Sequence, residues 1–135
     1  MWTVFAIWFM LISGQPVASE PVELFDTDEE RVVSTSANTE EFQREARAIL
    51  ASVTARVLEL NPPLAHASIV KIPLAPPQRL EVKGAQIEGE ITQMFVVIPK
   101  RGQRKPYLIL HTKDNVTLVV EFVEPIERLQ RMVHL

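Results

Sequence analysis

The sequence predicts an α+β domain in which one long helix packs on a curved antiparallel sheet of about five strands, with a short helix at the C-terminus. Apolar residues recur at three- and four-residue steps over residues 39–60, which is the period of an amphipathic helix. From residue 68 onward the period changes to two, which is typical of half-buried strands. A helix followed by a run of strands favours a helix packed on one face of an antiparallel sheet.

An uncharged apolar leader precedes this domain. Residues 1–18 contain no lysine, arginine, aspartate or glutamate, and Val4–Ile12 is continuously apolar. As a helix this run would be about 14 Å long, which is too short for a bilayer core of about 30 Å. Helix breakers and small residues follow in the order of a secretory signal, although no basic residue precedes the run. We therefore expect residues 1–18 to be a signal peptide and the protein to be periplasmic or secreted, with membrane contact only through an uncleaved leader.

The residues after the leader are strongly acidic. Residues 19–41 hold eight acidic residues and one arginine, whereas residues 42–135 hold thirteen basic and nine acidic residues. Residues 19–37 lack a sustained period, so we expect an extended or disordered lead-in, in which Arg31–Val33 could add an edge strand. The domain proper is expected over residues 38–135, and it should fold without the lead-in.

The chain contains no cysteine. Disulfides, thiol nucleophiles and cysteine-ligated zinc are therefore excluded, and the domain must be held together by packing. The hydrophobic fraction of 47% is too high for a disordered protein. A small exported domain without disulfides favours a bacterial envelope or extracellular protein.

The long helix is predicted over residues 39–60. Asn38 can cap its first turn, and Glu41 three residues later completes a capping-box arrangement. Asn61–Pro63 ends the helix, because proline lacks the amide donor and restricts the residue before it. The apolar stripe consists of Phe42, Ala46, Ile49, Leu50, Val53, Val57 and Leu60.

The strand segments follow in order and are separated by breaker residues. Ala75–Pro77 is expected to interrupt the chain, and Lys113–Asn115 has the composition of a tight turn. Gly89 suggests a bulge or bend. Pro125 then begins a short helix. The predicted strands cover residues 68–73, 79–84, 86–92, 94–98, 106–112 and 116–123.

The last three strands are apolar on both faces, while a single long helix covers one face. Either the short helix and residues 62–78 cover the second face, or apolar surface stays exposed. Exposed surface would indicate a homodimer, a partner protein or a ligand groove.

The most distinctive polar feature is a basic loop between two apolar strands. Lys100, Arg101, Arg104 and Lys105 place four cations within six residues. Such a cluster could bind an anion or contact a partner, or it could be a charged hairpin tip that opposes edge aggregation. Nucleic-acid binding is not expected, because the domain is not strongly basic and aromatic residues do not interleave with the cations.

The histidines do not form a recognisable site. His66, His111 and His134 are scattered through the sequence, so neither a metal site nor a cofactor is predicted. His111 lies near Asp114, and a histidine–aspartate pair between them is conceivable. A histidine at the surface of a turn is the simpler interpretation.

Two further patterns resemble parts of catalytic sites. Ser68–Lys71 matches SxxK, but it falls in a predicted strand and its partner motifs are missing. Glu88 and Glu90 share one strand face at about 7 Å, the spacing of alternate strand residues. Both tryptophans lie in the leader, so the tryptophan-lined cleft of a glycosidase is not expected. We therefore predict a protein that is not an enzyme.

These observations favour a small exported interaction domain that binds another envelope or extracellular protein, with a homodimer as a further option. The basic loop would contribute to that contact. The alternative is a domain that binds a hydrophobic ligand or lipid on the sheet face under the helix. A closed cavity would favour the ligand, and an apolar patch rimmed by charge would favour the partner.

Overall fold

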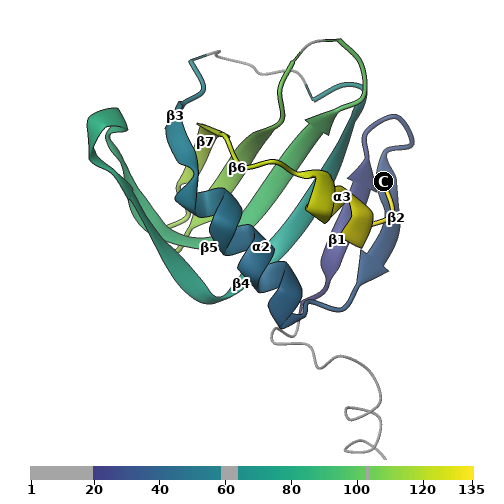
Figure 1. Cartoon of the computed structure of the whole chain (residues 1–135), viewed down its shortest axis with the longest axis horizontal. Helices are drawn as coiled ribbons and strands as arrows, with labels where there is room; N and C mark the ends of the chain where they lie inside the picture. The colour runs from purple at the N-terminus through teal and green to yellow at the C-terminus, as the bar shows by residue number, and fades with distance from the viewer. Residues whose placement is uncertain (1–19, 59–63, 103) are drawn as a thin grey trace, which may run out of the picture.

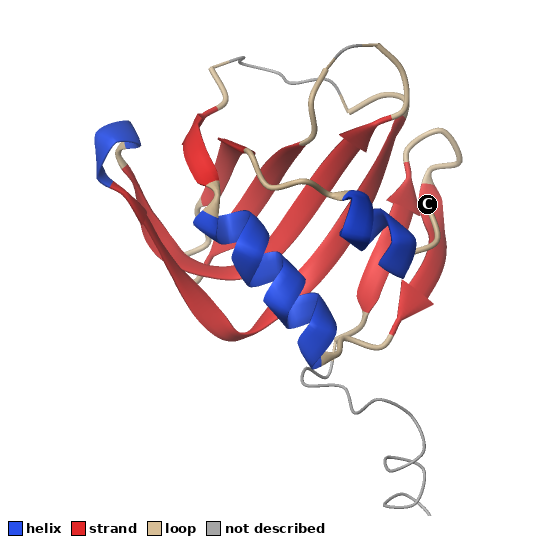
Figure 2. Ribbon diagram, viewed as in Figure 1, coloured by secondary structure: helices blue, strands red, loops and turns tan. Residues whose placement is uncertain are grey.

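The computed structural model describes residues 20–58, 64–102 and 104–135. These residues form a seven-stranded antiparallel sheet of order β2-β1-β4-β5-β6-β7-β3 with two short helices on one face (Figures 1 and 2). The helices are α2 (Glu40–Ala51) and α3 (Glu127–Met132), and a 3₁₀ turn, η1, spans Lys83–Ala85. The strands are β1 (Val22–Asp26), β2 (Arg31–Ser36), β3 (Val53–Arg56), β4 (Ala67–Val82), β5 (Ile87–Pro99), β6 (Tyr107–Thr112) and β7 (Thr117–Phe122).

The predicted architecture of one long helix on a five-stranded sheet is therefore wrong. The helix ends at Ala51, and after Ser52 the residues Val53–Arg56 form the edge strand β3, which pairs with β7. Val53 and Thr54 are β-branched and favour a strand, and the ladder to β7 satisfies backbone groups that a longer helix would otherwise pair. The apolar steps at Val53 and Val57 resemble a helical stripe, but they belong to this strand region.

Ser52 joins the end of α2 to the end of β7. Its hydroxyl donates to the carbonyl of Ile49 at 2.8 Å and accepts the amide of Glu124 at 3.0 Å. Its own carbonyl accepts the amide of Val123 at 3.2 Å. The helix terminus is thus held by a chain segment about seventy residues away, which the local sequence pattern does not contain.

Two of the seven strands, β1 and β2, lie within the predicted lead-in of residues 19–37. β1 pairs with β2 on one side and with β4 on the other, so it lies inside the sheet rather than beside it. Val22 and Leu24 are 1% and 7% exposed and join the core. β2, which contains the suggested edge strand at residues 31–33, forms one edge of the sheet.

The central strands are longer than predicted. β4 continues through Pro76 and Pro77, where the register to β5 shifts between Pro73 and Gln78. Proline cannot donate to a ladder, and the irregularity is where such residues are tolerated. The far parts of β4 and β5 extend beyond the body as a hairpin arm that ends in η1 (Figure 1). The strands β6 and β7 and the short helix α3 lie where the sequence predicts them.

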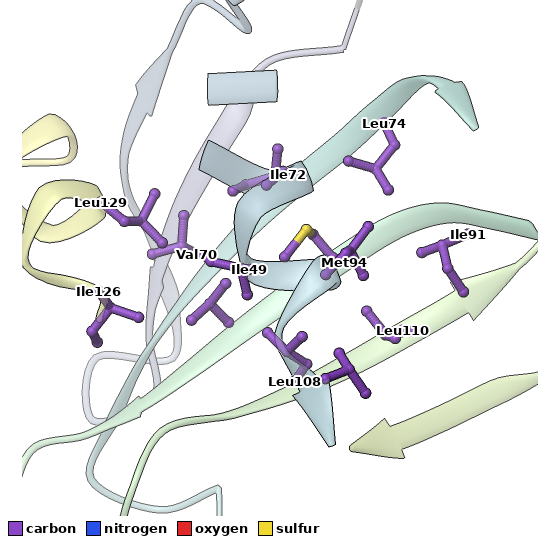
Figure 3. Close-up of a cluster of buried hydrophobic side chains, with 14 of the residues drawn as sticks. Ile49, Val70, Ile72, Leu74, Ile91, Met94, Leu108, Leu110, Ile126 and Leu129 are labelled. Carbon is purple, nitrogen blue, oxygen red and sulfur yellow. The ribbon is translucent and has the colours of Figure 1, made fainter. Parts of the chain in front are cut away.

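One main core fills the space between the helices and the sheet. Ile49 from α2 and Leu129 from α3 lie over inward-facing strand residues such as Met94, and all three are 0% exposed (Figure 3). Burying each such side chain contributes about 1.5–3 kcal/mol to stability. Both helices therefore cover the same face of the sheet, and we call the opposite face the outer face.

Asn38 has a different role from the predicted cap. The residue that caps α2 is Thr39, and its side chain makes no capping hydrogen bond. Asn38 is 0% exposed, and its amide donates to the carbonyl of Pro73 at 2.8 Å. Gln43 donates to the same carbonyl at 2.9 Å and to the Asn38 side-chain oxygen at 2.7 Å. This buried amide pair ties the first turn of α2 to the irregular part of β4.

The predicted leader lies outside the described residues. Within the three described ranges, no helix has the length and apolar character needed to cross a membrane.

Candidate functional site

The outer face of the sheet carries a continuous set of apolar side chains. Strand residues that face each other in register project to the same side of a sheet. One row runs Phe25–Ile69–Val97–Tyr107 across β1, β4, β5 and β6. The neighbouring row runs Lys71–Phe95–Ile109–Val119 across β4, β5, β6 and β7. The last three strands are thus apolar on both faces, and neither helix covers the outer one.

Part of this face is open to solvent. Val32 is 40% exposed, and Phe25, Ile69 and Phe95 are half-buried. These four residues line a shallow apolar hollow of about 210 Å³ together with one charged pair at its margin. That pair is Lys71 and Glu23, whose Nζ and Oε1 atoms are 3.6 Å apart. The hollow is large enough for a few apolar side chains, and a pair of opposite charges lies at its margin.

One corner of the outer face is covered. Val97 and Tyr107 are 0% and 1% exposed and form a second small cluster with Ala67. The Arg104 guanidinium lies 4.9 Å from the centroid of the Tyr107 ring, which is a cation–π arrangement. Burial raises the pKa of the Tyr107 hydroxyl above its ordinary value, and the nearby Arg104 charge opposes that shift.

The basic loop does not act as one cluster of four cations. Arg101 and Lys105 are exposed, Arg104 is half-buried over Tyr107, and Lys100 points back to the β1–β2 turn. A groove of about 410 Å³ opens beside the loop at the ends of β6 and β7, and its lining includes Thr54, Arg104, Lys105, Tyr107, Glu121 and Val123. The loop therefore offers positive charge at the margin of the outer face.

Lys100 belongs to a polar network that joins three segments. Its Nζ atom donates to Asp26 at 2.7 Å and to Asp28 at 3.0 Å, and His66 Nδ1 lies 2.7 Å from Asp28. The Lys100 hydrogen bonds hold the pKa of both aspartates below the ordinary value, with smaller contributions from backbone amides at Asp26 and from His66 at Asp28. The same bonds raise the pKa of Lys100. This network is structural: it fixes the β1–β2 turn against the end of β5.

His111 lies on the outer face, in register with Gln93 of β5. Its ring packs edge-on against Phe95, with centroids 5.1 Å apart. The shallow pocket next to it is lined by hydroxyl and amide side chains, namely Thr92, Gln93, Thr112, Asn115 and Thr117. Asp114, the suggested partner, is not among the lining residues. In the part of the chain that the structure describes, no three His, Asp or Glu residues are arranged to hold a metal ion.

The two other patterns that resemble catalytic sites are placed in β4 and β5. Ser68 and Lys71 both lie in β4, where residues three apart project to opposite faces of the sheet. Glu88 forms an ion pair with Arg79, and Glu90 lies 3.9 Å from Lys113. Glu88 is therefore paired within the hairpin arm, whereas Glu90 lies beside a lysine of the β6–β7 turn.

The residues of the outer hollow are those that sequence reasoning missed. Phe25 and Val32 lie in the predicted lead-in, whereas Ile69 and Phe95 lie in the predicted strands at residues 68–73 and 94–98. A usable signal exists at residues 22–25, where apolar Val22 and Leu24 alternate with Glu23 and Phe25. This alternation indicates a strand with one aromatic residue on its polar face.

Comparisons with known proteins leave the family open: the chain matches no protein-family model, no curated protein and no solved structure.

Proposed function

We propose that this protein is a small exported interaction domain that binds another protein of the envelope or extracellular space through the outer face of its sheet. The observation that carries this proposal is the hollow lined by Phe25, Val32, Ile69 and Phe95, which lies on the face without helices. Exposed aromatic and branched apolar side chains grouped on one face are typical of interaction sites.

The chemistry of the hollow defines the partner that fits it. A small number of apolar side chains would fill the space, and the Lys71–Glu23 pair at its margin would pair with polar groups around them. Such a centre with a polar rim is the usual arrangement of a protein–protein contact. The cations Arg101 and Lys105 would add attraction for acidic groups at one end of the face.

The alternative, a hydrophobic-ligand site under the helix, has less support. The side chains that fill the space between α2 and the sheet are 0% exposed, among them Ile49, Met94 and Leu110. Side chains packed to this degree leave no room for a ligand without repacking. The apolar leader at residues 1–18 supports the exported location in this proposal.

Site-specific photo-crosslinking in the source cells tests the proposal. A photoreactive amino acid at Phe25 or Phe95 should yield the same discrete crosslinked species, whereas one at Arg131, exposed on α3 of the opposite face, should not. The substitution Phe95→Lys, combined with the reactive residue at Phe25, should abolish the product while circular dichroism stays unchanged. Equal crosslinking from both faces, or none from either, would contradict an interface on the outer face.

A further inference from the structure

We propose that the partner contributes an extended, basic segment that adds to the sheet as a further strand beside β2. This inference rests on the proposed function, since it names the mode of binding and the chemistry of the segment at the margin of the outer face. It is carried by the unpaired edge of β2, by the hollow that borders this edge, and by the excess of carboxylates around it.

β2 forms an open edge of the sheet. Among the described strands it pairs only with β1, so alternate backbone amides and carbonyls along Arg31–Ser36 point away from the sheet. Four of its six residues are exposed, none is proline, and Arg31 is the only charged one. Valine and threonine, which make up half of the strand, favour extended backbone. Such an edge offers hydrogen bonds to a strand of another chain.

The opposite edge of the sheet is protected in a way that β2 is not. β3 has only four residues, and its register to β7 is irregular. Arg56, its last residue, donates to the carbonyl of Gln86 at 2.8 Å, which holds the tip of the hairpin arm beside this edge. β2 has one irregularity, at Val33, and paired residues lie on both sides of it. A short or covered edge resists strand addition, so β2 is the edge that can accept a partner.

The hollow of the outer face extends to this edge. Val32 on β2 is 40% exposed and lines the hollow together with Phe25, its register partner on β1. Side chains directly opposite each other on neighbouring strands contact one another. A partner residue opposite Val32 would therefore continue the apolar lining, and an aromatic or branched side chain fits that position. Strand addition takes its affinity from backbone hydrogen bonds and its specificity from such side-chain pockets.

The N-terminal hairpin, residues 20–36, stays acidic after its ion pairs are counted. It holds six carboxylates and one arginine, and Lys71 and Lys100 from neighbouring strands pair with some of the carboxylates. Even when His66, which contacts Asp28, is counted as a fourth cation, the carboxylates remain in excess. A segment with positive charge is therefore complementary to this hairpin. The carboxylates are those of Glu20, Glu23, Asp26, Asp28, Glu29 and Glu30.

The carboxylates flank β2 at both ends. Glu29 and Glu30 lie in the turn that precedes it, and Glu20 lies two positions before Val22, which is in register with Ser36. The strand itself is uncharged after its first residue. The segment that fits is therefore apolar in its centre and carries lysine or arginine at its ends. Its affinity should fall as salt is added, since exposed charges are screened.

Hydrogen–deuterium exchange of the full chain, measured by mass spectrometry, tests the inference. The probe is a synthetic peptide with a centre of valine and phenylalanine and with lysines at both ends. Its control has the same side chains but N-methylated amides in the centre, so it keeps the charge and apolar character and cannot donate to a ladder. The probe should slow exchange over residues 31–36 at least tenfold, and the control should leave it unchanged. Neither peptide should protect β3.

A matched pair of variants separates the edge from the rest of the outer face. Thr35 on β2 and Thr117 on β7 are both exposed, and their register partners Glu23 and His111 place both on the outer face. Thr35→Lys should weaken binding of the probe at least tenfold, because a lysine at the edge opposes a basic strand. Thr117→Lys changes the net charge equally and should leave the affinity within twofold of the wild type. Thermal melting of both variants checks that the fold is retained.

Protection of β2 by the N-methylated peptide, equal protection of β3, or no protection by either peptide would overturn the inference. Protection that rises with protein concentration in the absence of peptide would also overturn it, because a second copy would then occupy the edge. The proposed function fails separately, when reactive residues at Phe25 and Phe95 yield no crosslink. If they yield a crosslink while the probe leaves β2 unprotected, the proposed function stands and only strand addition is excluded.

Discussion

The Nζ atom of Lys100 lies 2.7 Å from a carboxylate oxygen of Asp26, across 74 positions of sequence. This contact turns the first cation of the basic loop toward the body of the protein. Three hydrogen bonds between Thr27 and Ala67, of 3.0, 2.9 and 3.1 Å, strengthen the same junction between the β1–β2 turn and the start of β4. The loop, for which the sequence leaves anion binding, partner contact and a charged hairpin tip open, thus also holds the N-terminal hairpin in place through Lys100.

Removal of the Lys100 charge should lower the thermal stability of the protein in a pH-dependent way. The pKa values of Asp26 and Asp28 lie below the ordinary 3.8, so their stabilising effect is present above that pH and is lost as pH falls through the lowered values. The pKa of Lys100 is raised above the ordinary 10.5, so its contribution to stability is complete below pH 10.5 and is lost as the pH rises through the raised pKa. Melting curves should therefore place Lys100→Met below the wild type between these limits, with the two converging in stronger acid.

Lys105→Met provides the matched control for that experiment, because Lys105 is an exposed lysine of the same loop. Its melting temperature should stay close to that of the wild type at every pH. A Lys100→Met protein that melts with the wild type at neutral pH would show that the network contributes nothing to stability.

Gln43→Leu should destabilise the fold by about 2–4 kcal/mol, because it leaves buried polar groups without partners. Gln43 is 1% exposed, and its side chain bonds to Asn38 and Pro73 and accepts the amide of Ala75 at 3.1 Å. Chemical denaturation measures the loss. Gln130→Leu on α3, where the glutamine is half-buried, should change the free energy of unfolding much less. An equal loss in both variants would mean that the buried network has no special role.

A chain that begins at Asn38 should lose cooperative unfolding. The fold reverses the expectation drawn from composition, since the deletion removes β1 and β2 and exposes the β4 edge together with the core that Val22 and Leu24 cover. A chain that begins at Glu20 retains every described strand and should unfold cooperatively. Circular dichroism during thermal denaturation compares the two, and cooperative melting of the shorter chain would show that β1 is dispensable.

The exported protein should begin near Ser19 or Glu20. The uncharged apolar run at residues 4–12 supports this expectation. N-terminal sequencing of the protein recovered outside the cytoplasm measures the start of the chain, and Ile7→Arg, which places a charge in the run, should retain the protein inside the cell. Soluble exported protein that still carries Met1 would rule out cleavage.

The sequence predicts well those elements of this protein that depend on neighbouring residues alone. The turn at residues 113–115 and the strands on either side of it follow from alternation and turn composition. The helix start is close to its predicted place, but its end is not, because Val53 and Thr54 satisfy both a helical period and a strand. Only the pairing of Val53 with Phe122, 69 positions away, decides between the two.

The candidate site shows the same contrast between what neighbouring residues predict and what only the pairing of distant segments decides. The sequence by itself determined that the chain lacks cysteine, that residues 1–18 are uncharged, that residues 19–41 are acidic and that residues 100–105 are basic. The tertiary structure alone decided that β1 inserts between β2 and β4, that Phe25 and Phe95 therefore share an outer face, and that Lys100 is bound to Asp26. Periodicity depends on neighbouring residues, whereas the face that a strand presents and the partner that a charge finds depend on pairing between distant segments.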